Sequence, residues 1–80
     1  MSGAEPPVLD LRGMRCPLPV LKSRKRLAGM VAGAHLVIVT DDPLAGLDIP
    51  AFLRDAGHRL LTTERQADRH RFLVERSAHS

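Results

Sequence analysis

The sequence predicts an α/β fold, a two-layer α/β sandwich in which two helices cover one face of a mixed four-stranded sheet. Three observations support this prediction. The 80 residues suffice for one small domain with a modest core. Strand-like and helical apolar spacing alternate in the order β-α-β-α-β-β. The helical connections are short, which favours right-handed crossovers and places both helices on the same face of the sheet.

The first strand and the first helix occupy the N-terminal part of the chain. The short apolar segment 8–11 is the predicted first strand. It follows a polar, proline-bearing segment, 1–7, that we expect to be a flexible tail. Gly13 lets the chain turn without a side-chain clash. From Pro17 onward, apolar residues recur at helical spacing as far as Gly29 and Gly33. The predicted buried stripe consists of Val20, Leu21, Leu27, Ala28 and Val31, with Ser23 on the polar face.

The remaining elements follow from three further patterns. Residues 35–40 are a branched apolar run without alternation, which predicts a central strand buried on both faces and ended by the turn at 41–43. Asp48 is the candidate N-cap of a second helix, unless that helix begins one turn earlier, and Gly57 is its C′ residue. Two strands, 58–65 and 70–76, are joined by a hairpin loop over 66–69. The core face of the second helix carries Ile49, Phe52, Leu53 and Ala56.

Composition limits the classes of protein to which the chain can belong. We expect one domain over 8–76, with a tail at 77–80. The single cysteine excludes an internal disulfide, so packing must supply the stability. No apolar run is long enough to span a membrane, and the expected location is the cytoplasm. The net charge of +3 is concentrated between Arg12 and Arg26 and suits an acidic partner or RNA.

The segment 13–19 holds that one cysteine, Cys16, between an extended stretch and a helix. Proline is tolerated in the first turn of a helix, so Pro17 and Pro19 predict that Cys16 lies at or near the N-cap. Free backbone N–H groups and the helix dipole would then favour the thiolate, which is the nucleophile. The nearby basic residues add positive charge: Arg12, Arg15, Lys22, Arg24, Lys25 and Arg26. The sequence therefore predicts a reactive cysteine.

Several other interpretations stay open from the residues alone. Cys16 could be an inert core residue, or a redox sensor that forms a sulfenic acid or a mixed disulfide. An RNA-binding module suits the fold order, but two phenylalanines without tyrosine or tryptophan leave little aromatic surface for base stacking. Turn and cap roles explain the aspartates better than acid–base chemistry does. The histidines lack metal-ligand spacing, so no metal site is expected.

Two motifs resemble the TusA or SirA-like family of sulfur-carrier proteins. The first is Asp10-x-x-Gly13-x-x-Cys16-Pro17-x-Pro19. The second is Asp41-Asp42-Pro43 followed by Asp48-Ile49-Pro50-x-Phe52, with Gly57-His58 after the helix. Together they span nearly the whole folded region in the matching order. Some family members carry an acidic residue between the two prolines, where this chain has Leu18, so the motif does not select one branch or pathway.

The resemblance implies a sulfurtransferase that accepts sulfane sulfur on Cys16 as a persulfide and relays it to an acceptor protein. Gly13, Arg15, Pro17 and Pro19 would form the supporting motif. The donor would be a cysteine desulfurase or another persulfide protein, and the pathway would be tRNA thiolation, cofactor sulfuration or sulfur oxidation. No cofactor, metal, membrane or direct nucleic-acid partner is expected, and transient contacts suit a monomer. The candidate residues for docking acidic partners are Arg12, Arg15, Lys22 and Lys25.

Overall fold

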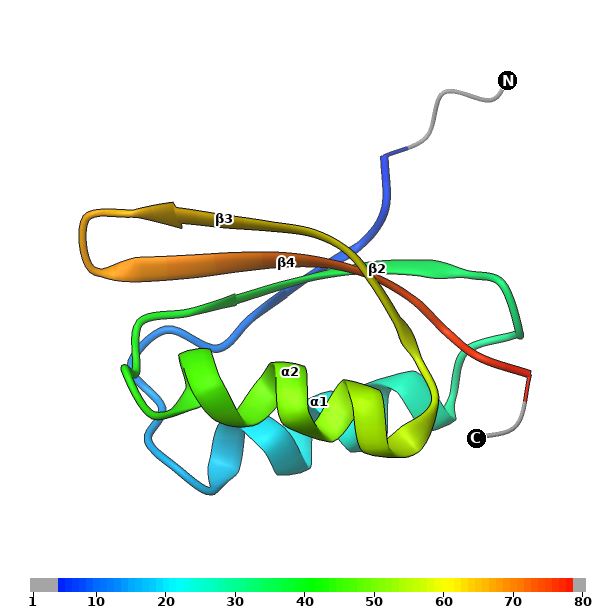
Figure 1. Cartoon of the computed structure of the whole chain (residues 1–80), viewed down its shortest axis with the longest axis horizontal. Coiled ribbons are helices and arrows are strands. Elements are labelled where there is room, and N and C mark those ends of the chain that lie inside the picture. Colours follow the sequence, from blue (N-terminus) through cyan, green and yellow to red (C-terminus); the bar gives the residue numbers. More distant parts are fainter. Residues whose placement is uncertain (1–4, 79–80) are drawn as a thin grey trace.

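The structure is a computed structural model that describes residues 5–78 of the chain. Two helices and a four-stranded sheet follow one another in the predicted order β-α-β-α-β-β. Figure 1 shows both helices on one face of the sheet, as the sequence predicts. The elements are β1 (Val8–Asp10), α1 (Leu18–Ala28), β2 (His35–Thr40), α2 (Ala45–Ala56), β3 (Arg59–Gln66) and β4 (Arg69–Glu75).

The sheet is mixed, and its strand order is β1-β2-β4-β3. β1 runs parallel to β2, whereas β4 pairs antiparallel with both β2 and β3. The predicted central strand 35–40 is therefore interior and has the predicted bounds. The predicted tails lie partly outside the described residues. Pro7 and Ser77 belong to the bonded fold, since the Pro7 carbonyl accepts from the Val37 N–H and the Ser77 N–H donates to His58 Nδ1.

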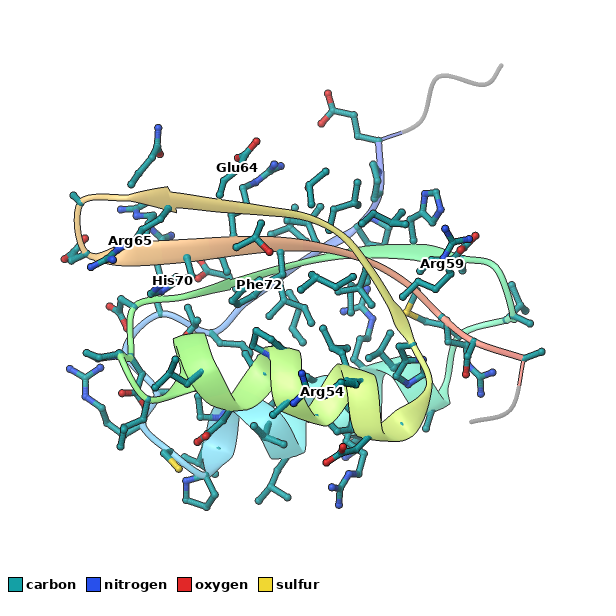
Figure 2. All side chains as sticks on the ribbon, viewed as in Figure 1. Arg54, Arg59, Glu64, Arg65, His70 and Phe72 are labelled. Atoms are coloured by element: carbon teal, nitrogen blue, oxygen red, sulfur yellow. The ribbon has the colours of Figure 1, made fainter. Side chains whose placement is uncertain are left out.

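The core lies between the sheet and the two helices. Figure 2 shows Phe72 pointing from β4 toward the helices, whereas Glu64 points from β3 away from them. Alternating side chains of β2 and β4 thus supply the core, as a sheet covered on one face requires. The buried apolar cluster consists of Leu11, Leu27, Leu36, Ile38, Ala45, Ile49, Leu53, Phe72 and Val74.

The buried face of α1 differs from the predicted stripe. Leu21 is 49% exposed and Val31 is 76% exposed, whereas Ser23 is completely buried. The residues buried from this helix are Pro19, Ser23 and Leu27, which recur every four positions. Ser23 can be buried because its hydroxyl donates to the Pro19 carbonyl one turn earlier, at 2.8 Å. A serine that satisfies its own polar group thus replaces an apolar residue in the interface.

Helix α2 begins earlier than the predicted cap. Its N-cap is Leu44, so Asp48 is not the N-cap and the alternative start one turn earlier is confirmed, with Pro50 inside the helix. Asp48 instead sits in the first turn, where a carboxylate interacts favourably with the helix dipole. The helix ends as predicted at Gly57, whose φ of 85° lies in the left-handed region that glycine tolerates. Phe52 is only partly buried and packs against the core.

The C-terminal hairpin is tighter than predicted. Gln66 and Arg69 pair with each other as the last ladder residues, which leaves a two-residue turn, Ala67 and Asp68, where the predicted loop covers 66–69. Ala67 adopts a φ of 49°, a conformation that alanine rarely adopts. The sequence therefore does not mark this two-residue turn with the glycine or asparagine that such turns favour.

The first strand ends one residue earlier than predicted, although the Leu11 N–H still donates to the Val39 carbonyl at 2.7 Å.

The buried His58 makes the fold sensitive to acid. Burial, followed by the charge of Arg76, lowers the pKa of His58. The unfolded chain therefore binds this proton more readily, and the stability contribution of His58 is complete above its ordinary pKa of 6.5 and is lost as the pH falls from there through the folded-state pKa. We expect urea unfolding to show a lower free energy at about pH 5 than at about pH 8, with a smaller fall in His58→Asn. An undiminished fall in the variant would contradict this assignment.

Candidate functional site

The turn after β1 and the turn after β2 form the site together. Because β1 and β2 are parallel neighbours, their carboxyl ends meet at the same edge of the sheet. The first turn carries Cys16 into α1, and the second carries Asp41 and Asp42 into α2. Two motifs that lie 26 residues apart are thereby in direct contact.

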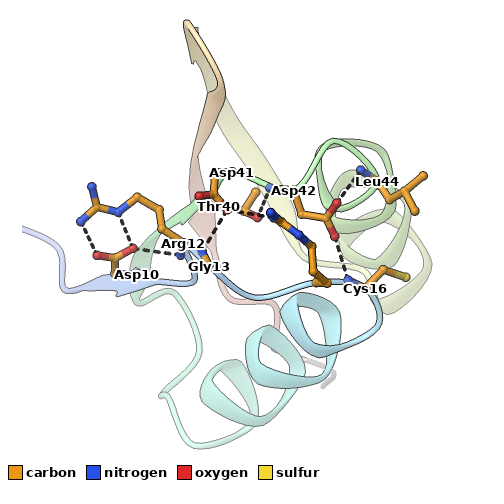
Figure 3. A network of polar contacts seen from close by, with 9 residues as sticks. Asp10, Arg12, Gly13, Cys16, Thr40, Asp41, Asp42 and Leu44 are labelled. Atoms are coloured by element: carbon orange, nitrogen blue, oxygen red, sulfur yellow. Dashed lines mark hydrogen bonds and ion pairs between the residues drawn. The ribbon is translucent and has the colours of Figure 1, made fainter.

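Asp42 holds the cysteine turn in place, as Figure 3 shows. Its carboxylate accepts from the Cys16 backbone N–H at 2.7 Å and from the Leu44 N–H at 3.2 Å. The Asp42 N–H in turn donates to the Thr40 hydroxyl at 3.2 Å. Asp42 is only 4% exposed and Thr40 is completely buried. A buried carboxylate bonded to two backbone N–H groups fixes the position of Cys16 relative to α2.

Both arginines among the predicted docking residues form ion pairs with aspartates at the same edge of the sheet. Asp41 accepts from the Gly13 N–H at 3.0 Å and from Arg15 at 3.4 Å. Arg12 makes a two-pronged contact with Asp10, at 2.9 and 2.7 Å (Figure 3). These hydrogen bonds lower the pKa of Asp10 to about 2. Of the cations predicted beside the cysteine, Arg12 and Arg15 are therefore each paired with a carboxylate.

The thiol of Cys16 is exposed and donates to Asp48 Oδ2 over 3.4 Å. This hydrogen bond, then burial and the negative charges of Asp48 and Asp42, raise the pKa of the Cys16 thiol. The prediction of a thiolate favoured by free helix N–H groups is therefore wrong for the resting protein. The helix N-cap is Pro17, preceded by a cis Cys16–Pro17 peptide, and no side chain caps α1.

A shallow groove of about 380 Å³ opens beside the thiol, between α1 and α2. Arg24 lies over one face of its Phe52 ring, 5.4 Å from the ring centroid. The groove is lined by apolar residues and by charged residues of both signs, and it lies open beside the Cys16 thiol. Its lining residues are Cys16, Pro17, Val20, Arg24, Asp48, Ala51, Phe52 and Asp55.

The other predicted docking residues lie away from the thiol. Lys22 and Lys25 line a different groove, together with Arg26, Gly29 and Met30. Gly13 adopts a φ of 86°, in the left-handed region. The turn toward the cysteine therefore favours a residue without a side chain at this position. Pro19 is buried in the first turn of α1, where its ring packs and its missing N–H is not needed.

Sequence reasoning missed the aspartates that contact the cysteine. The sequence suggests a turn role for Asp42 and a cap role for Asp48, and in the structure only Asp42 has such a role, through the Leu44 N–H. The available signal was the parallel pairing of the first two strands, which brings the turns that follow them together. Within residues 5–78, no group of three or more histidines, cysteines and acidic residues could hold a metal ion, and no helix could cross a membrane.

The fold and the site together define a class of protein: a small α/β sandwich that presents one exposed cysteine at the entrance of its first helix. The sulfurtransferase TusA family model matches residues 8–76, and the chain belongs to this family. A solved SirA-like protein from Desulfitobacterium hafniense has the same fold, with a TM-score of 0.76 and 19% sequence identity. That match covers 89% of this chain and 97% of the SirA-like protein. Proteins of the TusA family carry sulfur in relays with partner proteins.

Proposed function

We propose that the protein carries sulfane sulfur as a persulfide on Cys16 and passes it to the cysteine of an acceptor protein. The observation that supports this most strongly is the exposed Cys16 thiol, fixed through its backbone by buried Asp42 and open to a groove between the helices. Membership of the sulfurtransferase family agrees with this role. The sequence has one cysteine, so an internal disulfide cannot discharge the sulfur.

Loading is a displacement at sulfur. The Cys16 sulfur attacks the terminal sulfur of a donor persulfide, R–S–SH, and the bond between the two donor sulfurs breaks. The electron pair of that bond leaves with the donor cysteine, which takes up a proton while Cys16 loses one. The sum, R–S–SH and Cys16–SH giving R–SH and Cys16–S–SH, needs no external oxidant or reductant. The reverse chemistry, with an acceptor cysteine as the attacking group, unloads the carrier.

Partner proteins set the direction of transfer in this proposal. A cysteine desulfurase is a suitable donor, because it generates a protein persulfide from free cysteine. Arg15 remains 67% exposed in its ion pair, and Lys22 and Lys25 are also exposed. These cations favour encounter with acidic partner surfaces, which increases the association rate more than the affinity. No resident cofactor takes part in the proposed transfer.

The proposal is tested by incubating the reduced protein with a cysteine desulfurase and free cysteine and recording the intact mass. We expect a gain of one sulfur atom per chain that dithiothreitol removes, because the chain has a single thiol. A generic persulfide donor, such as glutathione persulfide, serves as the control for donor selectivity. Loading by the generic donor alone would show that the desulfurase is not the donor. Failure with both donors, while the desulfurase releases alanine normally, would contradict the proposed function.

A further inference from the structure

Asp48 is the residue whose side chain is hydrogen-bonded to the Cys16 thiol. Asp48 projects from the first turn of α2 and accepts the thiol hydrogen bond at 3.4 Å. It is partly buried and lines the groove beside Cys16. Asp48 does not cap α2, which has no side-chain cap, and among residues 5–78 the Cys16 thiol is the side chain to which its carboxylate is hydrogen-bonded. Besides its favourable place at the start of the helix dipole, the Asp48 carboxylate thus contacts the reacting sulfur.

The charges around the sulfur come from each element that borders it. α2 contributes Asp48 and, further along the groove, Asp55. α1 contributes Arg24, which lies over the Phe52 ring. The turn after β2 contributes Asp42, which is bonded to the Cys16 backbone, and Arg15 beside the cysteine is bonded to Asp41. The closest ionisable partner of the thiol itself is thus a carboxylate, and its charge acts directly on any anion formed at Cys16.

Loading changes the chemistry that Asp48 faces. An empty thiol is a donor, and a carboxylate is its natural acceptor. A persulfide is a stronger acid than the thiol from which it forms, so the loaded group is ionised to a greater extent at neutral pH. An ionised terminal sulfur has no proton to donate and repels a neighbouring carboxylate. The contact that stabilises the empty carrier therefore becomes unfavourable in the loaded carrier.

We propose that Asp48 is a positioning residue that holds the empty thiol against α2 and drives the loaded terminal sulfur outward, toward the acceptor. This inference rests on the proposed function and deepens it, since it assigns a role to a second residue of the same site. The same carboxylate stabilises the empty carrier relative to the loaded one. Asp48 thereby makes the carrier easier to discharge and prevents sulfur from being retained on Cys16.

The experiment compares the wild type with Asp48→Asn and with Asp55→Asn, a matched loss of a groove carboxylate that does not bond the thiol. The first measurement is the rate of iodoacetamide alkylation of the reduced proteins across pH. Because the contact with Asp48 raises the pKa of the Cys16 thiol, we expect the alkylation profile of Asp48→Asn to move to lower pH. Near neutral pH its rate should rise roughly two- to fivefold, with little change in Asp55→Asn.

The second measurement equilibrates each protein with glutathione persulfide and glutathione and records the loaded fraction by mass. We expect the loading equilibrium constant of Asp48→Asn to exceed that of the wild type by roughly three- to tenfold, since the variant lacks the repulsive charge. Urea unfolding of the three proteins establishes that the variants are folded.

The outcomes separate the two proposals. A wild type that takes up no sulfur refutes the proposed function and this inference with it. Normal loading of the wild type with an unchanged alkylation profile or an unchanged equilibrium in Asp48→Asn overturns the role of Asp48 alone. Equal shifts in Asp48→Asn and Asp55→Asn also overturn it, because they would show a general effect of net charge. If Asp48 had only a structural role, Asp48→Asn would be less stable than the wild type but would change neither the alkylation profile nor the loading equilibrium.

Discussion

Replacing Cys16 with serine is expected to abolish sulfur loading and leave the fold intact. Serine preserves the size of the side chain but cannot form a persulfide, so the mass gain seen for the wild type should be absent from Cys16→Ser. Cys16 is exposed and lies outside the buried cluster, so the free energy of unfolding should change by less than about 0.5 kcal/mol. Intact mass and urea unfolding measure the two effects.

Leu18, two residues after Cys16, supplies a control for this experiment. It is 48% exposed, and Leu18→Ala disturbs the same turn while retaining the thiol. Leu18→Ala should still accept one sulfur atom. A serine variant that gained the same mass as the wild type would show that sulfur is held elsewhere, and it would refute Cys16 as the carrier residue.

Among changes at the site that leave the thiol in place, Asp42→Ala is expected to lower the free energy of unfolding most. It removes the acceptor of the Cys16 and Leu44 N–H groups, and hydrogen bonds to a buried charge are stronger than neutral ones. We expect a loss of about 2–4 kcal/mol of unfolding free energy, because both donors lose their partner. Urea denaturation followed by circular dichroism measures this loss.

Asp41→Ala is the matched control, because Asp41 is the preceding residue and also bonds the cysteine turn. Its contacts with Gly13 and Arg15 are exposed, so its loss should cost less than about 1 kcal/mol. Equal destabilisation of the two variants would contradict the claim that buried Asp42 anchors the turn. A stable Asp42→Ala with unchanged thiol reactivity would do the same.

The sequence was sufficient for the fold because its local signals agree with one another. The branched run at 35–40 has the bounds of β2, and Gly57 ends α2 in the left-handed conformation that glycine favours. The burial of Ser23 was not predictable from apolar spacing, because its hydroxyl is satisfied by the Pro19 carbonyl. The sequence left two alternatives for the start of α2, because Leu44 caps the helix without a side-chain hydrogen bond that could mark the earlier start.

The site was predictable in its central residue but not in its electrostatics. The isolated Cys16 between prolines pointed to a thiol at the entrance of a helix. The state of that thiol depends on Asp48, 32 positions away, whose carboxylate reaches Cys16 only in the folded chain. Arg12 and Arg15 look like a source of positive potential in the sequence, but Arg12 pairs with Asp10, two residues before it, and Arg15 pairs with Asp41, which only the fold brings close. A count of charges near Cys16 in the sequence cannot reveal the pairing of Arg15 with Asp41.

The central claim, a sulfane sulfur on Cys16, is tested most directly by cyanolysis of the loaded protein. Intact mass alone is insufficient, because two oxygen atoms have nearly the mass of one sulfur and a sulfinic acid would imitate a persulfide. Cyanide removes sulfane sulfur as thiocyanate and leaves a sulfinic acid unchanged. We predict one thiocyanate per loaded chain and the return of the protein to its reduced mass. A mass gain that survives cyanide, with no thiocyanate formed, would show an oxidised cysteine and contradict the account.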